Sequence, residues 1–129
     1  MKVILDASVI IDHLRQPNKQ NTFLARISFE SEGVISLVTV AEVYSGKKVQ
    51  VPGKQQDDLR IIFAGTEIVI PEKTTAMTVG LLRARYAMSL GDAFIAALAM
   101  ERDLSIATLN DKDFRKIKEV RLYEFKAKK

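Results

Sequence analysis

The chain has 129 residues, of which 47% are hydrophobic and 28% charged, and its formal net charge is +4. This length suits one domain with a real hydrophobic core. Cysteine is absent, which excludes disulfides, thiolate metal sites and a nucleophilic cysteine. The excess positive charge favours a polyanionic partner such as nucleic acid, but simple solubility is the alternative, because Lys126, Lys128 and Lys129 supply much of the excess.

Short apolar runs rich in β-branched residues alternate along the chain with segments of helical periodicity. The runs predict buried strands at 3–5, 34–38, 67–70 and 104–108, with a fifth, edge strand at 120–123. The periodic segments predict helices that begin at Val9 and that lie at 21–32, 39–48, 57–63, 72–88, 92–102 and 110–117. Gly33 is expected to end the second helix as a C-cap. Strands that alternate with helices imply a parallel sheet with helices on both faces.

Residues 1–125 are expected to form one domain followed by a basic tail at 126–129, because no linker or internal repeat divides the chain. No apolar stretch approaches the ~20 residues that are needed to cross a bilayer. The first apolar run is interrupted at Asp6 and Asp12, before a secretory signal could form. We therefore expect a cytoplasmic protein without membrane contact.

Acidic residues follow several of the predicted strands. They are Asp6 after the first, Glu42 after the second, Asp92 at the start of the apolar helix 92–102, and Asp111 and Asp113 with Asn110 after the fourth. In a parallel sheet these points gather at one edge, where ligands bind. Carboxylates in one crevice raise each other's pKa and destabilise the fold unless a cation joins them. Because an all-oxygen set selects Mg²⁺ or Mn²⁺, the sequence predicts a divalent-metal site at this edge.

Helix capping is the alternative explanation for each acidic residue taken alone. The spacing at 39–42 and at 89–92 is that of a capping box, and Asn110 could cap the helix that follows it. Other chemistry has less support. A Ser–His pair would need the single histidine, His13, which is expected near the surface of the first helix, and the six glycines are isolated, so no phosphate-binding loop is present.

Four segments resemble, in order, the motifs of PIN-domain ribonucleases, and most closely those of the small VapC-type toxins of bacteria and archaea. They are VILDAS at 3–8, TVAEV at 39–43, LGDAFIAA at 90–97 and TLNDKDF at 108–114. The ordered set spans nearly the whole chain and is specific. The resemblance implies a three-layer α/β/α sandwich with a central parallel sheet, metal-dependent endonuclease activity on RNA, an antitoxin that blocks the site, and a homodimer.

By position, the resemblance makes Asp6, Glu42 and Asp92 the three core acidic residues, and Ser8 the hydroxyl that accompanies the first. The fourth acidic position stays open. Some PIN domains have an Asp two residues after the threonine, where this chain has Asn110. The later Asp-Phe of toxin-like members matches Asp113, and Asp111 is a further candidate; the matches favour Asn110 and Asp113 over Asp111.

The implied mechanism is metal-assisted hydrolysis, in which Mg²⁺ held by Asp6 and Asp92, with Glu42 close by, activates water for in-line attack on a phosphodiester. Basic residues around the crevice would attract the substrate phosphates, and the candidates are Arg15, Lys47, Lys48, Lys112 and Arg115. Two alternatives remain at this stage. One is an RNA-processing PIN nuclease that is not a toxin, and the other is a non-catalytic module that binds RNA or protein.

Overall fold

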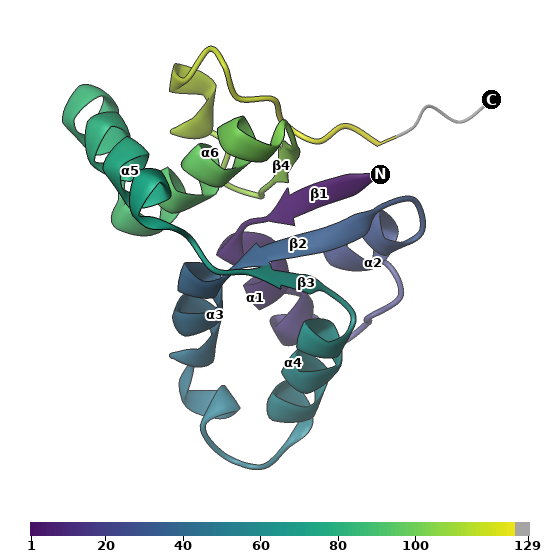
Figure 1. The fold of residues 1–129 in the computed structure, drawn as a ribbon. Helices are drawn as coiled ribbons and strands as arrows, with labels where there is room; N and C mark the ends of the chain where they lie inside the picture. The colour runs from purple at the N-terminus through teal and green to yellow at the C-terminus, as the bar shows by residue number, and fades with distance from the viewer. Residues whose placement is uncertain (126–129) are drawn as a thin grey trace.

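The computed structural model describes residues 1–125, so the basic tail predicted at 126–129 lies outside the described residues. A four-stranded parallel sheet in the order β3-β2-β1-β4 forms the centre of the fold (Figure 1). The strands are β1 (Lys2–Leu5), β2 (Glu32–Ser36), β3 (Glu67–Val69) and β4 (Ser105–Ala107). Ile4 of β1 pairs with Val34 on one side and with Ile106 on the other. The central position of β1 explains why its apolar residues are fully buried.

Helices cover both faces of this sheet. They are α1 (Ala7–Arg15), α2 (Phe23–Ser28), α3 (Leu37–Tyr44), α4 (Lys54–Ala64), α5 (Lys73–Tyr86) and α6 (Leu90–Arg102), with short 3₁₀ turns η1 (Lys47–Val49) and η2 (Phe114–Lys116). Figure 1 shows α5 and α6 on one side of the sheet and α1 to α4 on the other. The parallel sheet and the three-layer α/β/α arrangement predicted from the sequence are therefore confirmed. No helix within residues 1–125 combines the length and the apolar character that crossing a membrane requires.

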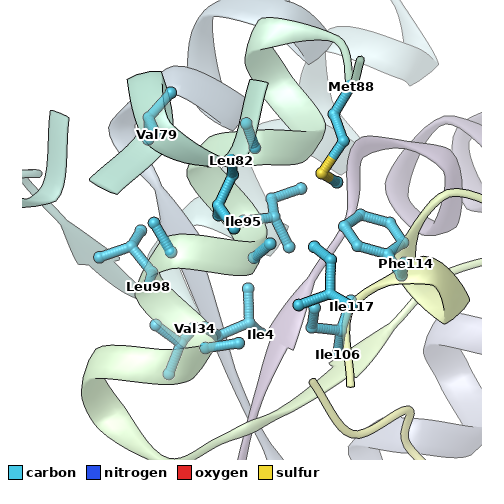
Figure 2. Packing of buried hydrophobic residues seen from close by; sticks show 14 of the residues in the cluster. Ile4, Val34, Val79, Leu82, Met88, Ile95, Leu98, Ile106, Phe114 and Ile117 are labelled. Carbon is cyan, nitrogen blue, oxygen red and sulfur yellow. The ribbon is translucent and has the colours of Figure 1, made fainter. Parts of the chain in front are cut away.

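Alternation along β1 divides the apolar residues between two cores, because successive side chains of a strand point to opposite faces. Ile4 belongs to the core beneath α5 and α6, whereas Val3 and Leu5 belong to the core formed with α1, α3 and α4. Figure 2 shows the first core, in which Phe114 and Ile117 pack beside Ile106 of β4. Both side chains are at least 98% buried and anchor the segment that follows β4 against the sheet.

The second strand begins and ends earlier than expected. Gly33, predicted as a helix C-cap, lies inside β2 and does not have the positive φ of a C-cap glycine. A Cβ at position 33 would lie 2.8 Å from Leu5 Cδ1, so the close packing of β2 against β1 explains the glycine. The strand ends at Ser36, whose hydroxyl accepts a hydrogen bond from the N–H of Val38 and caps α3.

The predicted fifth strand is wrong. Around Leu122 the chain makes only an isolated parallel bridge to Ile106. Two hydrogen bonds hold it there, from Ile106 N to Arg121 O and from Tyr123 N to Ile106 O, and no further pairing follows. The helix predicted at 110–117 shortens to the η2 turn, whereas α4 and α6 begin three and two residues before their predicted starts, at Lys54 and Leu90.

Candidate active site at the carboxyl edge of the sheet

Asp6 stands where the chain leaves the central strand β1 for α1, and it is 6% exposed. Its backbone takes the N-cap position of α1, but its side chain makes no capping hydrogen bond. Instead, Oδ2 accepts hydrogen bonds from Ser8 Oγ at 2.7 Å and from Thr108 Oγ1 at 2.8 Å. Within residues 1–125, Oδ1 accepts none. Capping by the side chain therefore does not explain Asp6, and one of its oxygens is available to a ligand.

Two hydroxyls hold this carboxylate and link it to the loop after β4. Ser8 Oγ accepts from the N–H of Leu109 at 3.0 Å, and Thr108 Oγ1 accepts from the N–H of Asn110 at 2.9 Å. Because each hydroxyl accepts from the backbone, its proton is directed to Asp6 in a charge-assisted bond. Thr108 was not among the predicted site residues. It is the first residue of the TLNDKDF segment at 108–114, and this place in the motif was the sequence signal that could have identified it.

Glu42 reaches the site from α3. The predicted capping box between Thr39 and Glu42 is wrong, because Ser36 caps this helix and Thr39 lies fully buried within its first turn. The Glu42 side chain is open to solvent overall, but its carboxylate lies against α6 at Gly91. A Cβ at position 91 would stand 2.8 Å from Glu42 Cδ. The absence of a side chain at Gly91 therefore creates the space that the Glu42 carboxylate occupies.

Asp92 lies in the first turn of α6 and is half-buried. The hydroxyl of Ser89 accepts from its backbone N–H at 3.2 Å, so this part of the predicted capping box is present. Burial raises the pKa of Asp92, and the charges of Asp6 and Asp113 raise it further, against an opposing hydrogen bond with Ser89. Capping by Ser89 therefore explains why α6 begins here. It does not explain the Asp92 carboxylate, whose negative charge is destabilised by burial and by its acidic neighbours.

Three carboxylates repel one another across this crevice. Loss of hydration raises the pKa of Glu42, and the charges of Asp6 and Asp92 raise it further. Within residues 1–125 no lysine, arginine or histidine forms an ion pair with any of the three. The structure thus places the three predicted acidic residues close enough for their charges to act on one another. We call Asp6, Glu42 and Asp92 the carboxylate trio.

The trio fits a hard divalent cation in its chemistry. In the described part of the chain, no three acidic or histidine side chains are close enough to enclose a metal ion, so binding would require the carboxylates to draw together. The available donors are all oxygens, which suit Mg²⁺ or Mn²⁺. A cation would also relieve the repulsion that raises the pKa values of Glu42 and Asp92.

The candidates for the fourth acidic position separate in the structure. The charge of Asp113 reaches Asp92 and raises its pKa, although Asp113 Oδ1 also lies 2.9 Å from Lys116 Nζ. Asp111 pairs with Arg115 at 2.7 Å. Asn110 is exposed and enters the site through its backbone N–H. Of the three, Asp113 is the one whose charge acts on the trio.

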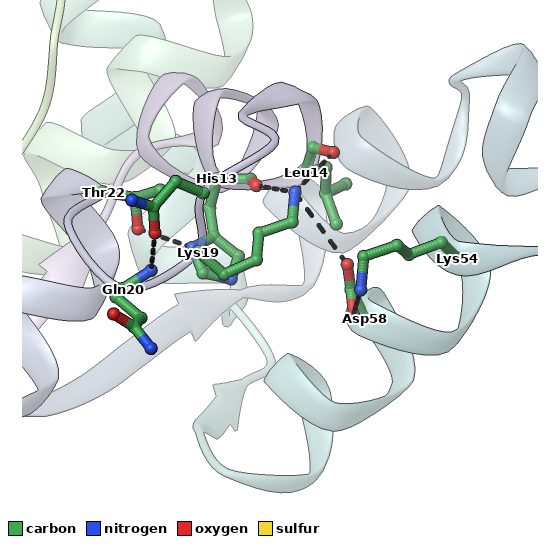
Figure 3. A network of polar contacts seen from close by, with 8 residues as sticks. His13, Leu14, Lys19, Gln20, Thr22, Lys54 and Asp58 are labelled. Atoms are coloured by element: carbon green, nitrogen blue, oxygen red, sulfur yellow. Dashed lines mark hydrogen bonds and ion pairs between the residues drawn. The ribbon is translucent and has the colours of Figure 1, made fainter.

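The alternative of a Ser–His pair has no support in the geometry. The ring nitrogen Nδ1 of His13 lies 2.6 Å from Thr22 Oγ1, in the polar network at the end of α1 (Figure 3). Ser8, the serine beside the candidate site, donates its hydroxyl proton to Asp6. His13 therefore joins α1 to the N-cap of α2 and takes no part in the crevice.

The PIN domain family matches residues 3–120. No curated protein matches the sequence. Among solved structures, the chain is similar to a toxin–antitoxin complex from Klebsiella pneumoniae, with 28% identity over 95% of this chain and 99% of that chain and a TM-score of 0.73. It is also similar to FitAcB from Neisseria gonorrhoeae, with 26% identity over 96% and 97% of the two chains and a TM-score of 0.72.

A third similar structure, DNA-bound VapBC from Salmonella typhimurium, has 20% identity over 95% of this chain and 97% of that chain, with a TM-score of 0.76, and supports the fold alone. The PIN domain match covers β1 from Val3 onward, all four segments singled out in the sequence and the other strands of the parallel sheet. Proteins of this type are typically nucleases and generally depend on a metal. The chain belongs to the PIN-domain family.

Proposed function

We propose that this protein is an endoribonuclease that depends on Mg²⁺ or Mn²⁺ and hydrolyses RNA phosphodiester bonds. The observation that carries the proposal is the carboxylate trio: Asp6, Glu42 and Asp92 converge from three elements at the carboxyl edge of the sheet, with raised pKa values at two of them and no cationic partner in residues 1–125. Groups with pKa values perturbed in this way concentrate at functional sites.

The residues of the chain have separate roles in this proposal. Asp6, Asp92 and Glu42 would hold the metal, and Asp113 is the proposed fourth acidic residue. When bound, the metal would polarise the phosphate and make water a stronger nucleophile near neutral pH. Ser8 and Thr108 orient Asp6 by donating hydrogen bonds to its Oδ2.

The test of the nuclease is cleavage of RNA by the purified protein. We expect cleavage with Mg²⁺ or Mn²⁺ and none after addition of EDTA. Cleavage that continues in EDTA would exclude the metal mechanism. If no RNA is cut in either ion, although the protein is folded, the nuclease proposal fails and a non-catalytic module takes its place.

We propose further that the protein is the toxin of a toxin–antitoxin pair. The similarity to the toxin–antitoxin complex of Klebsiella pneumoniae supports this, at 28% identity over nearly the full length of both chains. Expression alone should slow growth, and Asp92→Asn should relieve it at an equal protein level. An RNA-processing nuclease would instead cut RNA in vitro without arresting growth. The expected partners are an antitoxin protein and a second copy of the chain, to be measured as a complex on co-expression and as a dimer by light scattering.

A further inference from the structure

Three adjoining hollows extend away from the carboxylate trio between α1, α3 and α4. The first, of about 170 Å³, includes Glu42 in its wall, with Arg15 and Gln55. A second, of about 470 Å³, shares Arg15 and Gln55 and adds Lys47 and Lys48. The third, of about 560 Å³, again contains Arg15, Lys48 and Gln55. Because neighbouring hollows share these residues, they form one continuous depression, which we call the basic groove.

The charges of the basic groove are almost all of one sign. Its cationic side chains are Arg15, Lys19, Lys47, Lys48 and Lys54. Glu42, at the end that meets the trio, is the one carboxylate among the lining residues. In the described part of the chain, Arg15, Lys47 and Lys48 form no ion pair, so their charges are uncompensated. Such a one-signed depression attracts a polyanion.

A polar network fixes the wall of the groove (Figure 3). Lys19 Nζ donates to the carbonyl oxygens of His13 and Leu14, at the C-terminus of α1. The same ammonium lies 4.0 Å from Asp58 Oδ2 on α4, and Lys54 Nζ lies 3.8 Å from Asp58 Oδ1. Lys19 thereby joins α1 to α4. It also hydrogen-bonds to carbonyl oxygens at the C-terminus of α1, whose partial negative charge would otherwise repel a phosphate.

The opposite flank of the site also has a hollow, but its charges are balanced. This hollow, of about 490 Å³, reaches Thr108 and is lined by Asp111 and Glu124 as well as by Arg115 and Lys118. Arg115 Nε is 2.7 Å from Asp111 Oδ2. A phosphate that approached Arg115 would have to displace this carboxylate. Of the basic residues first considered as phosphate contacts, Arg115 is therefore committed to a partner, whereas Arg15, Lys47 and Lys48 are not. Lys112 also forms no ion pair in residues 1–125, but it lines none of these hollows.

We infer that the sugar–phosphate backbone of the RNA runs from the carboxylate trio along the basic groove, where Arg15, Lys47 and Lys48 contact its phosphates. This placement rests on the proposed function and adds to it the side on which the substrate is held. The three residues are positioning residues, because they act on the backbone beside the scissile bond. Phosphate contacts of this kind fix the register of the nucleic acid and carry no sequence information directly.

Two variants with the same change of charge test the placement. Arg15→Gln/Lys47→Gln/Lys48→Gln removes the basic groove contacts, and Lys112→Gln/Arg115→Gln/Lys116→Gln removes one arginine and two lysines from the opposite flank. Binding of a fluorescent single-stranded RNA is measured by anisotropy without divalent metal, at several NaCl concentrations. Each phosphate contact to a single strand contributes about 0.7 to the salt slope. The groove variant should lower that slope by about 2 and weaken binding about 100-fold at 0.1 M salt.

The flank variant should weaken binding less than about fivefold, since it would remove at most one phosphate contact.

Cleavage with Mg²⁺, measured in parallel, separates this placement from the proposed function. If the wild type cleaves but both variants lose equal affinity, the placement is overturned and the nuclease stands. If the wild type binds through the groove without cleaving, the placement stands and the nuclease fails. RNA that neither binds nor is cut overturns both. If the triple variant does not fold, Lys47→Gln and Lys48→Gln are each expected to weaken binding about fivefold, and unchanged binding in both overturns the placement.

Discussion

Acidic side chains are arranged differently in two neighbouring regions of this protein. Around η2, Asp111 and Asp113 each pair with a cation four or three residues later, at 2.7 and 2.9 Å. In the crevice, Asp6, Glu42 and Asp92 come from three separate elements, have no such partner in residues 1–125 and include two raised pKa values. The first arrangement is local and stabilising by less than about 1 kcal/mol per pair. The second arrangement destabilises the folded protein, because its carboxylates repel one another. Groups with pKa values perturbed in this way concentrate at functional sites.

Replacing one carboxylate in each region should give the largest contrast. Asp92→Asn should reduce kcat/KM on RNA by more than about 100-fold, because loss of a group that only hydrogen-bonds to a metal ligand already costs about 10–100-fold. Asp111→Asn should change kcat/KM less than about threefold, since an exposed pair contributes at most about 1 kcal/mol. Rates at saturating Mg²⁺ measure both. Losses of equal size would remove the distinction between the two regions.

Gly91→Ala tests how the crevice accommodates Glu42. The added Cβ would occupy the place of the Glu42 carboxylate and displace it from α6. Cleavage should fall at least about tenfold, because displacing a proposed metal ligand should cost no less than losing the hydrogen-bond partner of one. The melting temperature should hold or rise, because alanine favours a helix over glycine by about 1 kcal/mol.

Gly80→Ala is the matched control for this substitution. Gly80 lies in α5, and a Cβ there meets nothing within 4 Å. Both substitutions should raise helix stability, but only Gly91→Ala should slow cleavage. Equal rates in the two variants would show that the space at Gly91 does not position Glu42 for the reaction.

The smallest expected effect is a pH dependence of stability in the metal-free protein. The pKa of Glu42 is raised in the folded state above its ordinary value of 4.5. The ionised form of such a group is less favourable in the folded protein than in the unfolded chain. The free energy of unfolding is therefore unaffected below the ordinary pKa and falls as the pH rises from there through the folded pKa. Wild type should therefore lose stability above pH 4.5 relative to Glu42→Gln. Melting curves from pH 4 to 8 without metal measure this difference, and parallel curves for the two proteins would contradict the repulsion.

The sequence was sufficient to predict the gathering of Asp6, Glu42 and Asp92, because each follows a predicted strand or opens the buried helix, and parallel strands end at one edge. The same reasoning could not predict what holds them. The hydroxyl of Thr108 acts on Asp6 from 102 positions away, and the space at Gly91 belongs to Glu42 on another helix. These relations are tertiary, so they leave no periodic signal in the chain.

The errors in the fold have a similar origin. Gly33 is the residue type that commonly ends a helix, but close packing against Leu5 places it within β2. The segment around Leu122 has the composition of a strand, but only one bridge to Ile106 forms. In both cases the local preference of the residues gave way to contacts with β1 or β4, which a local pattern does not contain.

A melting titration with Mg²⁺, on wild type and on Asp6→Asn, tests most directly that the carboxylate trio is a cation site. Asparagine keeps one oxygen for the hydroxyls of Ser8 and Thr108, so the metal-free variant should melt at the wild-type temperature or higher. Wild type should gain about 2.7 kcal/mol when Mg²⁺ reaches 100 times its Kd, and the variant much less. Equal Mg²⁺-dependent shifts, with RNA cleavage retained in Asp6→Asn, would contradict the site.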